Sequence, residues 1–347
     1  MSEVLDTPLK RAIDRWFLSF QTKSDDFPVS EYRTNCLYFV KALADVYKTL
    51  ELSALLKGYD PEEELMCLND HGEDHVRVVI IRAKELIDLI KYEKLTPYEA
   101  YILLVSILIH DIGVRHGRKN HESKAREVIM SLNLNIGDDK IERECIFDIA
   151  WAHGGEEKDK ITRFSDDMIL GNKVRKRMLS AILKLADELS DGRFRCSKDL
   201  LKSGALPEGS KIYHQFSYSL HSVSISGDTI LFAFELDEND TKKMFKKKGK
   251  SIFLLDEIYE RTFKTHLERM YCNRFLTPEI NIHQIKVSIC IWLNALNENL
   301  KNIEHSISYS LGSEIGYPDI DPNDIFRICP HLLDETGAKI KEKFKEG

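Results

Sequence analysis

The spacing of apolar residues along the first 195 positions predicts helices. Leu9, Ile13, Trp16 and Phe17 recur at intervals of three or four, which is the period of one helix face. No alternating strand pattern occurs between residues 71 and 195, so we expect that stretch to contain no strand. The same helical period predicts further helices over Asn35–Leu56, Glu122–Leu132, Lys140–Ala152 and Asn172–Leu189.

Two more helices are predicted to be buried. The range Val76–Ile90 carries apolar residues on nearly all sides. Thr96 followed by Pro97 is typical of a helix start, with threonine as the cap and proline in the first turn. The helix that follows runs through the apolar stretch YILLVSILI and ends on two titratable residues, His110 and Asp111. Such residues at the end of a core helix call for a chemical explanation.

The pattern changes after residue 210. The range Lys211–Leu236 alternates polar and apolar residues, and Gly227-Asp228 in its middle predicts a hairpin turn. The helical period returns over Ser251–Tyr271, whereas His283–Leu296 fits either a strand or a buried helix. The chain ends in a Lys- and Glu-rich helix. We therefore expect a small α+β module in this part.

Composition and charge narrow the class of protein. The chain has 347 residues, of which 43% are hydrophobic, enough for a sizeable core. Its formal net charge of -7 argues against the coating of long nucleic acid. Seven cysteines without a CxxC pair are typical of reduced thiols in the cytoplasm. The first residues lack an apolar signal core, and no run of about 18 apolar residues occurs, so we expect no membrane span.

Several histidines and aspartates lie at the ends of the predicted apolar helices. Each histidine alone is more often a core or surface residue whose ring bonds a neighbour. A buried carboxylate at Asp111, however, is costly unless a cation neutralises it. Helical bundles build metal sites from imidazoles and carboxylates that project inward from several helices. The candidate metal ligands are His75, His110, Asp111, His121, His153 and Asp187.

This ordered set resembles the HD-domain superfamily of metal-dependent phosphohydrolases. The likeness rests on His75 in HVRVV, on LIHDIG with a histidine about ten residues later, and on Asp187 in LADELS, and it covers about residues 65–195. His121 and His153 match the members that hold two metals, among them HD-GYP-type phosphodiesterases and hydrolases of dinucleoside polyphosphates. The Gly-Tyr-Pro motif is missing from its expected place, so cyclic di-GMP is not assigned. The resemblance implies a mainly α fold, an HD-type helical bundle with a small α+β C-terminal module.

The resemblance also implies a set of ligands. Two divalent cations (Mn, Fe, Zn, Ni or Mg) would share Asp111. His71, one turn before His75 in DHGEDHVRVV, is an alternative first ligand, although His75 fits the helix phase better. One cation would be held by His75, His110 and Asp187, and the other by His121 and His153.

Cationic side chains near these ligands are candidates for phosphate binding. Arg115 and Arg118 follow the His-Asp pair in a glycine-containing loop, and the alternative is that this loop is simply solvated. Lys184 lies one turn before Asp187 and either reaches the substrate phosphate or pairs with a neighbouring glutamate. The lysine-rich run Thr241–Lys250 binds phosphate-rich ligands or nucleic acid or, more commonly for such a run, is a solvated turn. With Asp111, we take Lys184, Arg115 and Arg118 as the catalytic candidates.

These observations predict three segments. Residues 1–65 form an N-terminal helical segment packing on the core, residues 66–200 the metal-dependent hydrolase domain, and residues 201–347 the α+β module. We expect a hydrolase that uses metal-activated water on a nucleotide or nucleotide-derived phosphate: a dinucleoside polyphosphate, a (d)NTP, an alarmone or a cyclic nucleotide. The alternative is a nucleotide-sensing module that binds metal and ligand and signals to a partner without turnover. The expected partner is a small nucleotide, and the sequence is compatible with a homo-oligomer.

Overall fold

The computed structural model describes residues 6–20, 29–51, 69–137, 139–155, 157, 159–292, 303–312 and 324–344. Contacts divide the chain into two compact units. The first comprises Met1–Ser53, Asp70–Ser190 and Cys272–Ile280, and the second comprises Ala54–Asn69, Asp191–Tyr271 and Asn281–Gly347. The boundaries expected after residues 65 and 200 stay predictions. The N-terminal helices and the helices with the candidate ligands belong to the same unit.

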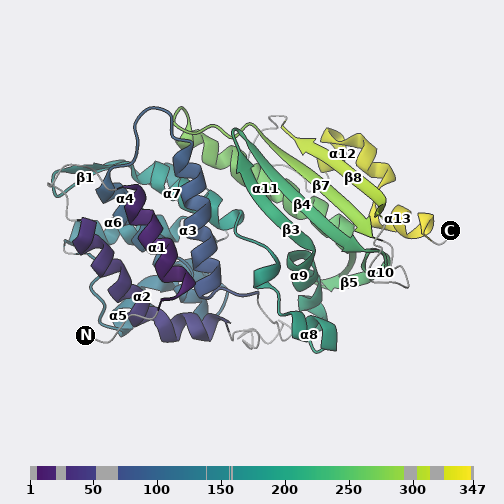
Figure 1. The fold of residues 1–347 in the computed structure, drawn as a ribbon, viewed down its shortest axis with the longest axis horizontal. Coiled ribbons are helices and arrows are strands. Elements are labelled where there is room, and N and C mark those ends of the chain that lie inside the picture. Colours follow the sequence, from purple (N-terminus) through teal and green to yellow (C-terminus); the bar gives the residue numbers. More distant parts are fainter. Residues whose placement is uncertain are drawn as a thin grey trace. The chain divides into compact units, whose positions relative to one another are not determined.

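The first unit consists mainly of α-helices (Figure 1). Short 3-10 turns, η2 (Ile112–His116) and η3 (Ile161–Arg163), lie between some of them. This part of the fold confirms the prediction of a mainly α, HD-type protein. The helices are α1 (Pro8–Ser19), α2 (Val29–Glu51), α3 (Glu73–Asp88), α4 (Pro97–Ile109), α5 (His121–Ser131), α6 (Lys140–Trp151) and α7 (Lys176–Glu188). The predicted helix Asn35–Leu56 corresponds to α2 as far as Glu51, and its last residues lie outside the described part of the chain.

Helix α4 is the central helix of this unit. It begins where the sequence predicts: Thr96 accepts a hydrogen bond from the Glu99 backbone, and Glu99 accepts one in return from the Thr96 backbone. Every residue from Tyr98 to Ile109 is buried, and the helix contacts α2, α3, α6 and α7. Two hydrogen bonds tie the N-terminal helices to it, from Trp16 to the carbonyl of Ala100 and from Tyr47 to the carbonyl of Leu108. The end of α4 is therefore fixed from several sides.

The expectation of no strand between residues 71 and 195 is wrong in one place. Strands β1 (Asp167–Ile169) and β2 (Asn172–Val174) form an antiparallel hairpin, and α7 begins at Lys176 instead of Asn172. The turn residues Leu170 and Gly171 have φ angles of 48° and 78°, the left-handed conformations of a two-residue hairpin. Three-residue strands are too short to give an alternating pattern, which explains why the sequence did not show them.

The second unit combines helices with a four-stranded sheet in the order β3-β4-β7-β8 (Figure 1). Strands β4 and β7 are parallel, and α11 lies in the long connection that such a pair needs. The sheet strands are β3 (Leu220–Ser226), β4 (Thr229–Asp237), β7 (Gln284–Trp292) and β8 (Ile303–Leu311), and a separate hairpin is formed by β5 (Met244–Lys247) and β6 (Lys250–Phe253). The helical elements are η4 (Arg193–Arg195), α8 (Lys198–Ser203), α9 (Glu208–Ser219), α10 (Glu238–Lys242), α11 (Leu254–Leu276), α12 (Asp324–Ile328), η5 (Pro330–Asp334) and α13 (Gly337–Lys343).

One face of this sheet is covered by helices. Alternate residues of β4 and β7 are buried, which is the expected pattern for a sheet with one covered face. Helix α9 contributes Phe216, whose ring lies 5.5 Å from that of Phe234. Helix α11 contributes Tyr259 and Thr262, which contact Tyr309 of β8. The α+β character predicted for the C-terminal part is thus confirmed.

Two details of this region correct or complete the sequence interpretation. The first part of the predicted strand range Lys211–Leu236 is helical in α9, because Ile212, Phe216 and Leu220 recur every four residues and are all buried. The range His283–Leu296, which fitted either a strand or a buried helix, forms the strand β7 as far as Trp292. The last residues of the predicted range, 293–296, lie outside the described part of the chain.

The lysine-rich run Thr241–Lys250 forms the end of α10 and most of the β5–β6 hairpin. Several of its lysines face carboxylates. Lys247 Nζ lies 2.7 Å from Glu257 and 2.8 Å from Glu260, and Lys243 lies 2.7 Å from Asp240. Lys243 and Lys247 therefore already have carboxylate partners, which argues against a phosphate site at these two residues.

One segment of the described residues, Pro97–His116, is long and apolar enough to cross a membrane. It contains α4, and 94% of its most apolar window is buried inside the protein. This is the behaviour of a core helix.

Candidate metal centre

The residues His110 and Asp111 lie at the inner end of α4. His110 has no exposed surface, and Asp111 is 4% exposed. The Nδ1 atom of His110 lies 2.7 Å from the carbonyl oxygen of Ile107. Because a carbonyl oxygen can only accept, Nδ1 carries a proton, which leaves Nε2 as the nitrogen that can bind a cation in place of a proton. The helix end thus presents one imidazole nitrogen and one carboxylate to the interior.

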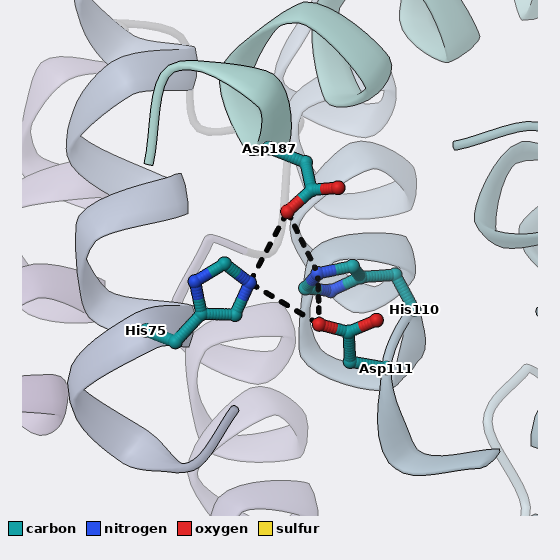
Figure 2. Close-up of side chains that lie close together, drawn as sticks. All are labelled: His75, His110, Asp111 and Asp187. Carbon is teal, nitrogen blue, oxygen red and sulfur yellow. Dashed lines mark ion pairs between the residues drawn. The ribbon is translucent and has the colours of Figure 1, made fainter. Parts of the chain in front are cut away.

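A first group of donors gathers around one oxygen of Asp111 (Figure 2). Its members come from the start of α3, the end of α4 and the last turn of α7. His75 Nε2 lies 3.2 Å from both Asp111 Oδ2 and Asp187 Oδ1. His110 Nε2 lies 3.3 Å from Asp111 Oδ2 and 3.7 Å from Asp187 Oδ1. Four of the six candidate ligands therefore converge on one point.

A second group of donors gathers around the other oxygen of Asp111. His121 Nε2 and His153 Nε2 lie 3.2 Å and 3.3 Å from Asp111 Oδ1, and 3.2 Å from each other. The Nδ1 atom of each ring faces a backbone carbonyl, that of Arg118 for His121 and that of Ala150 for His153. All six candidate ligands thus belong to two groups that share Asp111.

The spacing of these atoms fits bound cations. Donors that bind one cation at about 2.1 Å lie about 3.0–3.4 Å apart in octahedral or tetrahedral geometry. The nitrogen–oxygen distances in both groups are 3.2–3.7 Å. Moreover, the buried Nε2 atoms of His75 and His110 make no hydrogen bond of acceptable geometry despite these near oxygens. A divalent cation in the first group would satisfy both atoms, and the donor spacing in the second group fits a cation as well, so the residues fit a metal centre.

The electrostatics of the site also favour a cation. Burial by itself raises the pKa of Asp111, but the imidazoles around it, His110 first and then His71, hold that pKa well below its ordinary range. Burial lowers the pKa of His110, yet Asp111 and Asp187 outweigh this effect and raise the pKa to about 10. The pKa of His153 is lowered, chiefly by burial. The centre therefore stabilises positive charge beside Asp111, which bound divalent cations would supply.

The two alternative first ligands differ in burial and in their contacts with Asp111. His75 is fully buried and belongs to the first donor group. His71 lies just before α3, with a side chain 16% exposed, and its Nδ1 lies 2.9 Å from Asp111 Oδ2. Since a carboxylate only accepts, this His71 nitrogen donates the hydrogen bond. The geometry supports His75 as a ligand and His71 as a residue that orients Asp111.

Gly113 allows the start of α5, which carries His121, to lie close to the segment that carries Asp111. A Cβ atom at this position would lie 2.0 Å from the carbonyl oxygen of His121 and 3.1 Å from the backbone nitrogen of Ala125. The start of α5 therefore packs directly on the backbone of the HDIG segment. This close approach places His121 within reach of Asp111.

Comparison with known families agrees with this geometry. A model of the HD-CE family matches residues 62–261, which is more than half of the chain. The protein belongs to the HD-CE family. HD-CE is an HD-domain family, so the superfamily resemblance expected from the sequence is confirmed. No curated protein matches the chain.

The HD-CE match extends beyond the range in which the sequence motifs lie. It contains both donor groups and continues through β3–β6 into α11. HD domains bind divalent metals and are generally hydrolases. The coarse expectation of a metal-dependent phosphohydrolase-type domain is therefore supported by the family.

The three cationic candidates have different settings. Arg115 belongs to η2 and Arg118 to the loop before α5, and both side chains are exposed. Lys184 lies on α7 and is half-buried, and its Nζ donates to the carbonyl oxygen of His153 across 3.2 Å. Their roles toward a substrate stay predictions.

Sequence reasoning did not single out Lys160, which contacts segments beside two of the ligands. It lies in the charge-rich stretch GGEEKDKITR, where nothing in the pattern distinguishes it from its neighbours. Only its burial, with 2% of its surface exposed, reveals it.

Proposed function

We propose that this HD-CE protein hydrolyses a phosphate ester or anhydride in a nucleotide or nucleotide-derived compound, using two divalent cations. The observation that carries the proposal is the placement of Asp111. Its Oδ2 faces His75 and His110, whereas its Oδ1 faces His121 and His153. A carboxylate with one oxygen toward each donor group is suited to join two cations, and a structural site would need only one closed group.

Two bound divalent cations would lower the pKa of water and neutralise charge that develops on a phosphoryl group. The residues of the chain supply the rest. His110 and His121 are held through Nδ1 by backbone carbonyls, so their Nε2 atoms keep a fixed direction. Arg115, Arg118 and Lys184 are the cations that would bind the non-bridging phosphate oxygens, the arginines in bidentate fashion.

The donor set and the charge of the chain guide the choice of metal and substrate. Imidazole and carboxylate donors suit Mn, Fe, Zn or Ni, and Mg remains compatible with the carboxylates. The net charge of -7 favours a small nucleotide over long nucleic acid. Dinucleoside polyphosphates, (d)NTPs, alarmones and cyclic nucleotides are the classes to test, and we infer a cytoplasmic protein, since its cysteines follow no disulfide pattern.

The test is hydrolysis of a panel of these nucleotides with added Mn²⁺, comparing the wild type with Asp111→Ala. We expect the wild type to turn over one class and to bind about two metal ions per chain. Asp111→Ala should lose both metals and turnover, while circular dichroism shows that its helices remain.

Other outcomes contradict parts of the proposal. Absence of bound metal after reconstitution with Mn, Fe or Ni would remove the function altogether. Metal binding without turnover of any nucleotide would favour the nucleotide-sensing alternative, and ligand binding on the same panel would then be measured. Unfolding of Asp111→Ala would show that the residue is needed for the fold itself.

A further inference from the structure

We propose that Lys160 is a positioning residue that holds His121 and His153 together at the second donor group. The inference rests on the proposed function, because it assigns a role in binding one of the two cations. It concerns a residue that does not itself reach Asp111.

The ammonium group of Lys160 is buried and has a complete set of hydrogen-bond partners. It donates to Glu122 Oε1 across 3.2 Å, to the carbonyl oxygen of Trp151 across 3.1 Å and to that of Gly154 across 2.7 Å. It also lies 4.2 Å from the centre of the Trp151 ring. An ammonium group has three N–H donors, and here each has an acceptor. Lys160 therefore has no donor left for a substrate.

These acceptors belong to the two segments that carry the second donor group. Glu122 directly follows His121 at the start of α5. Trp151 ends α6, and Gly154 directly follows His153. One ammonium group thus connects a segment beside each histidine, although the two histidines are distant in the sequence. Their Nε2 atoms lie only 3.2 Å apart.

The backbone near His153 is shaped to admit this contact. Gly155 has a φ of 90°, a conformation that favours glycine. A Cβ atom there would lie 2.1 Å from Glu122 Oε1 and 2.8 Å from Lys160 Nζ. Both the conformation and the space at Gly155 therefore require glycine for Glu122 and Lys160 to meet.

The expected effect of Lys160 is selective. Among the described residues, its polar contacts involve none of His75, His110 and Asp187, which come from α3, α4 and α7. Metal–ligand distances tolerate changes of only about 0.2 Å. Loss of the ammonium group would leave two partly buried carbonyls and Glu122 Oε1 without this donor, so the segments beside His121 and His153 would separate. Binding of the second cation should be weakened, and binding of the first cation should be retained.

The test is Mn²⁺ binding to the metal-free full-length protein, measured by calorimetry and by elemental analysis after desalting. We expect two sites in the wild type. In Lys160→Met, one site should remain unchanged and the other should weaken about 10–100-fold, as for other residues that orient metal ligands. The electron paramagnetic resonance of the bound Mn²⁺ should change from a coupled pair to an isolated ion.

Lys176→Met is the matched control. Lys176 is also a buried lysine, with Nζ 2.6 Å from Asp148 and 4.9 Å from the centre of the Phe164 ring. Among the described residues, neither of its carboxylate partners, Asp148 and Asp167, lies within two residues of a candidate ligand. The Lys176→Met variant should lose stability as Lys160→Met does, but both of its metal sites should keep the affinity of the wild type.

The outcomes separate this inference from the proposed function. A wild type that binds no Mn²⁺ contradicts the function itself. A wild type with two sites, together with two unchanged sites in Lys160→Met, overturns only the role of Lys160, and so does equal weakening of both sites. Should Lys160→Met not fold, Glu122→Ala decides, because it removes the acceptor that Lys160 contacts on α5, and an unchanged second site in that variant would likewise overturn the role.

Discussion

The close contact at Gly113 gives a quantitative prediction for the second cation. In Gly113→Ala, the new Cβ would lie 2.0 Å from the His121 carbonyl oxygen, whereas an ordinary contact begins at 3.4 Å. The start of α5 would therefore have to withdraw by about 1.4 Å. That is several times the roughly 0.2 Å that a metal–ligand distance tolerates, so His121 should no longer serve as a ligand.

We expect Gly113→Ala to keep one metal site and to weaken the other at least about 10-fold. Overpacking of this kind typically costs about 1–3 kcal/mol of unfolding free energy, so the variant should remain folded. Calorimetric titration of the metal-free protein with Mn²⁺ measures both sites, and circular dichroism checks the helices. Turnover should fall together with the affinity of the second site for Mn²⁺.

Gly154→Ala is the control for this prediction. Its Cβ would lie 3.8 Å and 3.9 Å from Cε1 and Nε2 of the His121 ring, which is ordinary contact. This variant adds the same methyl group beside the same histidine and should bind two ions as the wild type does. Two unchanged sites in Gly113→Ala would refute the reasoning, because they would show that α5 moves without displacing His121.

Three further predictions concern phosphate binding and stability. Arg118→Ala should raise KM for the phosphate substrate with little change in kcat, and unchanged kinetics would place that loop with the solvated surface. Arg175→Met leaves the buried Glu99 carboxylate without the guanidinium that donates to it through Nε and Nη2, both across 2.8 Å. Urea denaturation should show a loss of about 3–5 kcal/mol, and a loss below about 1 kcal/mol would contradict a buried ion pair. Burial raises the pKa of Asp191, but Arg261 and other partners outweigh it and lower that pKa. Its stabilisation is therefore present above the ordinary aspartate pKa of about 3.9 and is lost as pH falls below it. The wild type should lose more unfolding free energy than Asp191→Asn between about pH 5 and pH 3, and parallel curves would refute this.

The sequence alone predicted the features that depend on neighbouring residues. Thr96, Pro97 and Glu99 form the start of α4 through contacts within one helical turn, so the pattern could be recognised directly. The ordered histidines and aspartates indicated a metal centre because the chemistry of a buried carboxylate demands a cation. The same local reasoning failed at Lys211–Ser219, where polar residues between apolar ones fit both an alternating strand and the four-residue period of α9.

The family resemblance already implied how the candidate ligands are divided, and the tertiary structure decided how they meet and what holds them. Nothing in the spacing of the sequence shows that Oδ1 and Oδ2 of Asp111 face different pairs of histidines. The same is true of Lys160, whose partners Glu122 and Trp151 come from α5 and α6. A cap or a helical period reflects forces that act over a few residues, whereas these contacts depend on how helices distant in the sequence pack together. The sequence therefore determined which residues can bind a metal, and the packing of the helices determined that they meet.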